Sequence, residues 1–294
     1  MVMETRRLGP GAPAVPAVGF GGMPLSIDGR PEDEAAAIRV VHAALEGGMT
    51  LVETADVYCL DDSDLGHNER LIAKALRSWS GAREAVIVAT KGGITRPQGD
   101  WRRDARPEQL LRACDRSLKA LGVERIDLYQ LHAPDPAVPF AESVAALAEL
   151  QRAGKVRWIG LSNVSVAEIE AARRQVTVVT VQNRLNPFFR EAIGTGVVAH
   201  CAKVGIGFLA YSPVGGGRLN KKLPGHPALE PIARRLGASA HAVALAWVLA
   251  QGPSVIVIPG ARTPEHVRDS ATAGALELAR EELAAIDGAE FSRA

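Results

Sequence analysis

Four residues able to take part in proton transfer lie at or just beyond the ends of three short apolar runs of the chain. Glu53 ends the run 50–53, Tyr58 lies just beyond it, Lys91 follows the run 85–89, and His132 follows the run 126–130. A cation beside a phenol stabilises the phenolate and lowers a pKa that is otherwise about 10, and a carboxylate keeps the cation charged and in place. These residue types indicate proton-transfer chemistry if the fold brings the three runs together.

Further polar residues follow the next three runs. They are Ser162 and Asn163 after 158–161, Gln182 and Asn183 after 176–181, and Tyr211 and Ser212 after 207–210. In a β/α barrel the C-terminal ends of all strands open on one mouth, where active sites occur. Such a barrel would gather all of these side chains.

The order of elements predicts such a barrel. Short β-branched runs alternate eight times with longer segments of helical period, which is typical of parallel strands joined by crossover helices. The predicted strands are 17–20, 50–53, 85–89, 126–130, 158–161, 176–181, 207–210 and 255–258, and Pro31 and Pro107 are expected to open helices over 32–45 and 108–121. With about 30 residues per unit and no linker, we predict a single (β/α)8 TIM-barrel domain over residues 1–294.

An open doubly wound sheet is the alternative fold. If it held a dinucleotide, it would usually carry a G-x-G-x-x-G turn after its first strand. The segment Gly19-Phe20-Gly21-Gly22 lacks the third glycine at that spacing, and the chain has no Walker-type phosphate loop. A bound nucleotide must therefore be held by another device. The Gly- and Pro-rich segment 212–238 is too long for a simple turn, and loops of that length are usually functional or disordered.

The composition excludes several classes of partner. The chain has 294 residues, a formal net charge of +1 and 47% hydrophobic positions, and its cationic residues are dispersed, which disfavours a nucleic-acid surface. No apolar run approaches the roughly 18 residues of a membrane span, and glycines and prolines break the stretch after Arg6 and Arg7 where an export signal would need an apolar helix. We expect a cytoplasmic protein without a nucleic-acid or membrane partner; the sequence predicts no oligomeric state.

The cysteines and histidines show no metal or redox motif. Cys59, Cys114 and Cys201 are widely spaced, so we expect free thiols, and Cys59 is expected to pack beside Tyr58 because no Cys/His signature surrounds it. No H-E-x-x-H pattern occurs, and the acidic stretch 61–64 lacks the pattern of a calcium loop. No metal site is predicted.

Several motifs together resemble those of the aldo-keto reductase family. Residues 53–58 (ETADVY) are similar to the family's D-T-A-x-x-Y, residues 89–91 (ATK) to its strand-three lysine motif, and residues 127–132 (DLYQLH) to its D-L-Y-x-x-H. Residues 154–163 (GKVRWIGLSN) resemble its G-K-V-R-x-x-G-x-S-N, and residues 258–262 (IPGAR) resemble its cofactor-binding loop after the eighth strand. The resemblance covers essentially the whole chain, with the motifs in the family's order and spacing.

The resemblance implies roles for the four proton-transfer residues. Tyr58 takes the place of the general acid, Lys91 that of the group lowering its pKa, and His132 that of the residue orienting the substrate carbonyl. Glu53 takes the carboxylate position, where the family has Asp, and this is the main departure from the pattern. Asp56 is not given that role, because two residues before the tyrosine it would lie on the wrong part of the turn.

The resemblance also implies an NADP(H) site. Ser162, Asn163 and Gln182 would hydrogen-bond the nicotinamide carboxamide, and Tyr211 would stack on its ring. The loop that contains Ser212, Gly216 and Leu219 would wrap the pyrophosphate with its backbone N–H groups. Arg262 would contact the 2′-phosphate, helped by Ser270 at a position that is usually Asn, while His266 stands where many members have Arg.

The resemblance therefore implies NADPH-dependent, reversible reduction of an aldehyde or ketone to an alcohol. Hydride would come from nicotinamide C4 and the proton from Tyr58, in a pocket lined by Met23, Pro24 and Trp101 and open on the side of the short C-terminal segment. The alternative is a cofactor-binding sensor or partner subunit with slow turnover, which the Glu53 departure supports. A barrel hydrolase is a third and weaker alternative, because neither a nucleophile nor a metal set occurs.

Overall fold

The eight central strands form one parallel sheet in the computed structural model, which describes residues 3–294. In chain order they are β3 (Phe20–Gly21), β4 (Leu51–Glu53), β5 (Ile87–Gly92), β8 (Ile126–Leu131), β9 (Val156–Ser162), β10 (Val178–Arg184), β11 (Gly207–Tyr211) and β12 (Val255–Val257). The first and last strands meet, because Val18 forms a parallel bridge with Val257 and Gly21 with Gly260. The sheet therefore closes, which confirms the (β/α)8 barrel and excludes the open sheet.

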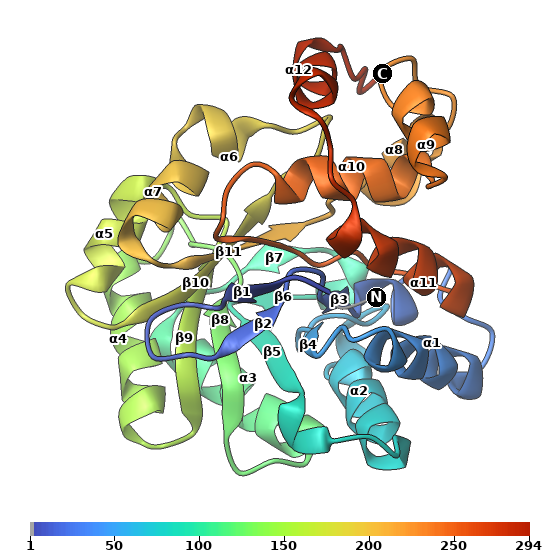
Figure 1. The fold of residues 1–294 in the computed structure, drawn as a ribbon. Helices are drawn as coiled ribbons and strands as arrows, with labels where there is room; N and C mark the ends of the chain where they lie inside the picture. Colours follow the sequence, from blue (N-terminus) through green and yellow to red (C-terminus); the bar gives the residue numbers. More distant parts are fainter. Residues whose placement is uncertain (1–2) are drawn as a thin grey trace.

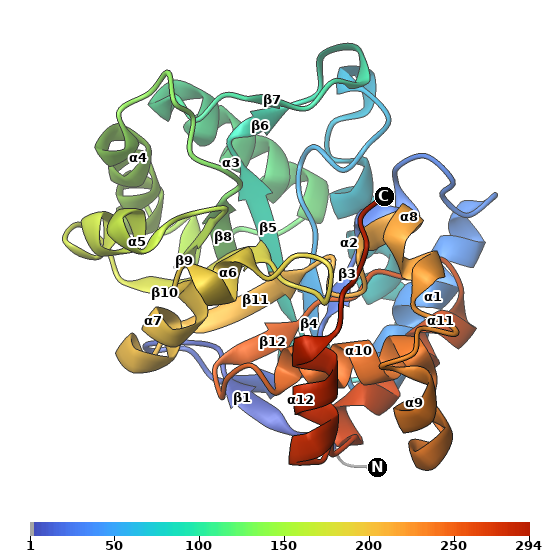
Figure 2. The same ribbon diagram turned by 90° about the horizontal axis from the view of Figure 1, so that it is seen from above.

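Helices surround the closed sheet, as Figure 2 shows from above. The helix that follows each barrel strand on the outside is, in order, α1 (Glu34–Glu46), α2 (His67–Ser78), α3 (Pro107–Leu121), α4 (Phe140–Arg152), α5 (Val166–Arg173), α7 (Val197–Val204), α10 (Ala240–Leu249) and α11 (Pro264–Thr272). Shorter additions are α6 (Glu191–Gly194), α8 (Gly216–Leu219), α9 (Glu230–Leu236), α12 (Arg280–Gly288) and the 3-10 turns Met23–Leu25, Asp62–Asp64, Arg83–Ala85, Pro97–Gly99, Asn220–Lys222 and Ala273–Ala275. Because α1 contacts both α2 and α11, the ring of helices also closes (Figure 1).

Capping residues explain where the first helices begin and end. α3 begins at Pro107, as the sequence predicts, and ends at Gly122, whose φ of 67° is the left-handed conformation that glycine adopts without strain. α1 begins later than predicted, at Glu34, because the Asp33 carboxylate accepts a hydrogen bond of 2.5 Å from the Ala36 N–H. Pro31 therefore precedes this helix and does not open it.

An antiparallel hairpin that the sequence analysis did not predict closes the N-terminal end of the barrel. Its strands are β1 (Thr5–Arg7) and β2 (Ala14–Pro16). Leu8 and Val15 of this hairpin pack with Trp158, Val179 and the other apolar side chains inside the barrel. The carbonyl of Leu8 also accepts a hydrogen bond of 3.1 Å from the N–H of Gly207, where a Cβ would lie only 2.1 Å from that oxygen. This end is sealed, so the opposite end forms the mouth.

Two insertions lie after barrel strands at the mouth. The hairpin of β6 (Ile94–Thr95) and β7 (Arg102–Arg103) follows β5 and carries Trp101. The segment 212–238 follows β11 and contains α8 and α9, so it is an ordered insertion rather than a structureless loop. Within residues 3–294, no helix combines the length and the apolar character needed to cross a membrane.

Candidate active site

A fully buried lysine ammonium lies at the centre of the mouth. Lys91, on β5, has no exposed surface, and its Nζ contacts the Glu53 carboxylate. The same Nζ donates hydrogen bonds to the Tyr58 hydroxyl (2.7 Å) and to the Thr54 carbonyl (2.9 Å). β4 and β5 are neighbours with Glu53 opposite Ala89, which places the end of β4 beside Lys91. The structure thus joins three residues that the sequence analysis singled out.

Tyr58 holds its proton firmly. Its hydroxyl donates a hydrogen bond of 3.0 Å to Glu53 Oε1, and the phenol is 6% exposed. Burial, and then the negative charge of Glu53, hold the pKa of Tyr58 well above its usual value of about 10. This direction corrects the sequence-based expectation of a lowered pKa, because burial and the carboxylate both disfavour a phenolate.

The pKa of Lys91 is shifted in the opposite direction to that of Tyr58. Burial lowers its pKa, because a desolvated ammonium loses its hydration, and the Glu53 carboxylate counteracts this effect. The longer side chain of Glu53 still reaches the lysine. It also reaches the Tyr58 hydroxyl, so a single carboxylate oxygen serves both groups.

Two aromatic rings face Tyr58. The centroid of the His132 ring lies 6.0 Å from that of Tyr58, the Trp101 ring lies 6.4 Å from both, and each pair meets edge to face. Burial, and then the charge of Lys91, hold the pKa of His132 well below its usual value, so the imidazole is neutral. Its Nδ1 is buried and has no partner among the described residues. A neutral imidazole can offer an N–H to an oxygen without adding a charge.

Asn163 links the ends of four strands, β8, β9, β10 and β11. Its Oδ1 accepts a hydrogen bond of 2.8 Å from the Tyr211 hydroxyl, and its Nδ2 donates to Ser162 Oγ (3.1 Å) and to the carbonyl of His132 (3.0 Å). Its backbone N–H donates to the carbonyl of Gln182 at 3.0 Å, and its φ of 59° is in the left-handed region. Nε2 of Gln182 is buried without a partner among the described residues. The cluster therefore holds a spare buried donor.

A cavity of about 300 Å³ opens beside Tyr58 and Tyr211. Among the predicted site residues, those that line it are Met23, Pro24, Glu53, Tyr58, Tyr211, Ser212, Gly216 and Arg262. Residues that line it without having been assigned to the site are Ile27, Asn220, Gly260 and His266, among others. Asn220 and Ile27 carry no motif signal, because they come from the segments around the strand-end motifs.

Two predicted cofactor contacts, Leu219 and Ser270, do not line the cavity, and a third, Arg262, is held at its edge by a backbone carbonyl. Leu219 is buried and its Cβ lies 2.8 Å from where a Gly215 side chain would begin, so it packs beneath the loop. Ser270 does not line the cavity; it lies on α11 four residues after His266, which does. The Arg262 guanidinium lies over Gly29 and donates a hydrogen bond of 2.8 Å to the carbonyl of Asp28.

The residues present fit a nicotinamide dinucleotide. The unpartnered amide of Gln182 is suited to a carboxamide, and Gly216 and Gly217 leave the backbone accessible where a pyrophosphate needs N–H donors. A guanidinium and an imidazole at the far rim, from Arg262 and His266, suit a phosphate. Such residues would hold a dinucleotide without a G-x-G-x-x-G turn.

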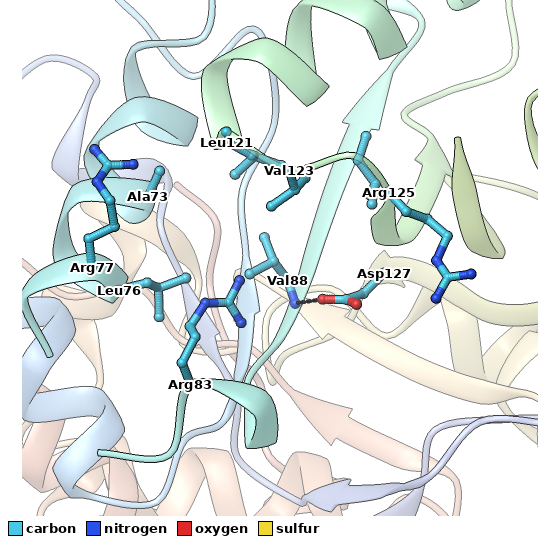
Figure 3. Close-up of a pocket in the computed structure, with 11 residues that line it drawn as sticks. Ala73, Leu76, Arg77, Arg83, Val88, Leu121, Val123, Arg125 and Asp127 are labelled. Atoms are coloured by element: carbon cyan, nitrogen blue, oxygen red, sulfur yellow. Dashed lines mark hydrogen bonds between the residues drawn. The ribbon is translucent and has the colours of Figure 1, made fainter. Parts of the chain in front are cut away.

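A second hollow, of about 170 Å³, lies near the starts of β5 and β8 (Figure 3). Its lining is mainly apolar, including Leu76, Val88 and Leu121. Its one carboxylate, that of Asp127, accepts a hydrogen bond of 3.1 Å from the N–H of Val88. None of the predicted site residues lines this hollow, and the candidate chemistry is confined to the mouth. Within residues 3–294, no group of three or more His, Cys, Asp or Glu residues is arranged to hold a metal ion.

Asp56 belongs to a separate buried network. It has no exposed surface, and its closest cation is Arg116, whose Nη2 lies 3.4 Å from Oδ2. Burial, and then the nearby Glu69, raise the pKa of Asp56 to about 8, because the partly exposed Arg116 guanidinium lowers the pKa too little to offset them. The carboxylate that contacts Lys91 is therefore Glu53 and not Asp56.

Comparisons with known proteins show which family and which fold this chain resembles. Residues 17–290 match the sequence model of the Aldo/keto reductase family. The chain is 33% identical over 274 residues to an uncharacterised oxidoreductase from Schizosaccharomyces pombe, which covers 92% of this chain and 85% of that protein.

Two solved structures share the fold over nearly their whole length. A glycerol dehydrogenase from Gluconobacter oxydans superposes with a TM-score of 0.84 at 31% identity, covering 98% of this chain and 95% of that chain. An aldo-keto reductase from Klebsiella pneumoniae in complex with NADPH superposes with a TM-score of 0.80 at 29% identity and the same coverage.

The raised pKa of Asp56 makes stability depend on pH. The folded state binds a proton that the unfolded state releases near pH 4, so this stabilisation is complete below that pH and is lost as the pH rises through about 8. We expect the free energy of unfolding of Asp56→Asn to rise relative to that of the wild type as the pH increases from about 4 to about 8, and to level off above that, measured by urea denaturation. A constant difference between the two proteins over that range would contradict the raised pKa.

Proposed function

The chain belongs to the Aldo/keto reductase family, and on that premise we propose that it reduces the carbonyl group of an aldehyde or ketone to an alcohol with NADPH. The observation that carries the proposal is the convergence of a protonated phenol, a buried ammonium and a neutral imidazole beside the cavity. When bound, NADPH would supply the hydride, so the chain itself needs to supply position, a proton and stabilisation of charge.

Tyr58 would donate the proton to the carbonyl oxygen. A general acid must carry its proton at the working pH, and the raised pKa of Tyr58 ensures that. As the proton leaves Oη, negative charge would develop 2.7 Å from the Lys91 ammonium, which would stabilise it. His132 would orient the carbonyl oxygen through an imidazole N–H, and Met23, Pro24 and Trp101 would form the walls around the substrate.

The cofactor would lie across the ends of the last strands. Ser162, Asn163 and Gln182 would hold the carboxamide, and Tyr211 would lie against the ring. Ser212 and Gly216 would contribute backbone N–H groups to the pyrophosphate. Arg262 and the nearby His266, which both line the cavity, would bind the 2′-phosphate, which is the basis for proposing NADPH rather than NADH.

Tyr58→Phe tests the proposal directly. We expect it to lower kcat for carbonyl reduction by roughly a hundred- to ten-thousand-fold while NADPH binding stays unchanged, because it deletes the proton donor alone. Turnover would be followed as NADPH absorbance across a panel of aldehydes and ketones. Tyr129→Phe is the matched control, since it also removes a buried hydroxyl. More than a tenth of the wild-type kcat in Tyr58→Phe would remove Tyr58 as the acid. Tight NADPH binding by the wild type without turnover of any carbonyl would favour the sensor instead.

Glu53 is the second test, because its carboxylate serves both Lys91 and Tyr58. Aspartate at this position keeps the negative charge beside Lys91, but its shorter side chain moves the carboxylate oxygen away from the Tyr58 hydroxyl by about the length of one methylene. Glutamine removes the negative charge that counteracts the effect of burial on the pKa of Lys91. We expect kcat for one good aldehyde to follow the order Glu53→Asp at or above wild type, then wild type, then Glu53→Gln. Glu46→Gln, on the exposed side of α1, is the control. A Glu53→Gln protein that matches wild type at every pH would contradict this role.

Arg262→Ala tests the choice of cofactor. The variant is expected to weaken NADPH binding by roughly ten- to a hundred-fold, because a charge-assisted hydrogen bond contributes about 1.5 to 3 kcal/mol, and to leave NADH binding nearly unchanged. Fluorescence titration of both cofactors measures the difference, with Arg268→Ala as the control, because Arg268 is an exposed arginine on α11, the helix that begins just after Arg262. Equal losses for the two cofactors would place Arg262 away from the 2′-phosphate.

A further inference from the structure

Asn68, at the start of α2, is fully buried and uses both ends of its side-chain amide. Its Nδ2 donates hydrogen bonds to the carbonyl of Gly22 (2.9 Å) and to the Ser26 hydroxyl (2.7 Å). Its Oδ1 accepts a hydrogen bond of 2.6 Å from the Thr54 hydroxyl. The Gly22 carbonyl can only accept, so the NH2 group must face it and Oδ1 must face Thr54. The orientation of the amide is therefore fixed by its partners.

On one side, this amide reaches the group that holds Lys91. Thr54 donates its hydroxyl to Asn68, while its backbone carbonyl accepts the 2.9 Å hydrogen bond from Lys91 Nζ. Of the three oxygens around the ammonium, this carbonyl is the only one that belongs to the main chain. A shift of Thr54 would therefore move an oxygen on which the buried charge depends.

On the other side, the amide holds the wall of the cavity. Gly22 and Ser26 flank Met23 and Pro24, which line the cavity beside Tyr58. The fit is close, because a Cβ at Gly22 would lie 2.5 Å from Asn68 Oδ1. One side chain thus connects the wall at 22–26 to the lysine site.

The next residue of α2 makes a parallel contact. The buried Glu69 accepts a hydrogen bond of 2.5 Å from the hydroxyl of Thr90, the residue before Lys91. The first turn of α2 therefore contacts the residue that follows Glu53 and the residue that precedes Lys91. Glu53 is the last residue of β4, and Thr54 follows it.

From these contacts we propose that Asn68 is a positioning residue for the reaction. It holds the Thr54 carbonyl against Lys91 and, through the same amide, sets the distance of the 22–26 wall from the Tyr58 hydroxyl. The inference rests on the proposed function for its effect on turnover, but its effect on Lys91 exists without any substrate. Asparagine is required because aspartate cannot donate to the Gly22 carbonyl and an apolar residue would leave that carbonyl and the Thr54 hydroxyl unpaired in a buried site.

Variants of the partners of Asn68 separate its effect on Lys91 from its effect on the 22–26 wall. Thr54→Val keeps the side-chain shape but removes the hydroxyl, so kcat is expected to fall by roughly tenfold or more with little change in KM, since a misplacement of about 1 Å can cost up to a hundred-fold. Thr54→Ser restores the hydroxyl and is expected to recover most of the activity. Ser26→Ala is expected to raise KM more than it lowers kcat, and Asn68→Ala to change both.

The Lys91 ammonium supplies a readout that needs neither cofactor nor turnover. Its titration is followed by NMR of 13Cε in labelled lysine, with the signal assigned by its absence in Lys91→Met. Weakening the Thr54 carbonyl contact removes stabilisation of the charged form, so Thr54→Val and Asn68→Ala are expected to move the midpoint to lower pH and Thr54→Ser to leave it in place. Ser143→Ala, which removes a buried hydroxyl bonded to the Ala105 carbonyl at 2.7 Å, is the control and is expected to change neither readout.

These readouts distinguish the possible failures. If the Lys91 titration midpoint in Thr54→Val equals that of the wild type, the positioning role of Asn68 is wrong. It is also wrong if Ser143→Ala lowers kcat and shifts the Lys91 midpoint as much as Thr54→Val does. If Asn68→Ala does not fold, the Thr54 pair alone decides the question. If the wild type reduces no carbonyl but the Lys91 midpoint moves as expected, the proposed function fails while the role of Asn68 stands.

Discussion

The buried charge of Lys91 is the constraint on which the rest of the mouth depends. Removing an ammonium from water costs several kcal/mol even after the protein relaxes, so the fold must provide oxygens in compensation. Glu53 provides the opposite charge, and Thr54 and Tyr58 provide two more oxygens. These groups come from the end of β4 and the turn after it, and they meet Lys91 because β4 and β5 are adjacent parallel strands.

The same burial sets the protonation of the neighbouring rings. Exclusion of water disfavours a phenolate at Tyr58 and an imidazolium at His132, so both rings keep neutral forms that can donate a hydrogen bond. Lys91 is then the cation toward which negative charge can develop, and Glu53 offsets that cation in the resting protein. The site is thus arranged around donors that are already protonated, with one positive charge behind them.

Sequence reasoning identified the barrel because the barrel follows from strand order. All eight strands were predicted, and parallel strands necessarily bring their C-terminal ends to one mouth. The hairpin before the barrel was not predicted, since its strands have three residues each and no helical or long β pattern marks them. The pKa direction of Tyr58 was wrong, because a cation is visible in the sequence but burial and the reach of Glu53 are not. Asn68 was missed because it looks like an ordinary polar helix start.

The three cysteines are all buried, so a new cysteine at the mouth could be labelled selectively. Cys59, Cys114 and Cys201 are free and buried, and burial raises the pKa of each to about 11 or 12, so little reactive thiolate is present near neutral pH. Trp101 is 47% exposed beside Tyr58 and His132. A single cysteine introduced at that position would react with a maleimide fluorophore ahead of the native thiols, without first removing any of them. The label would then report on the surroundings of the mouth while the native thiols stay unreacted.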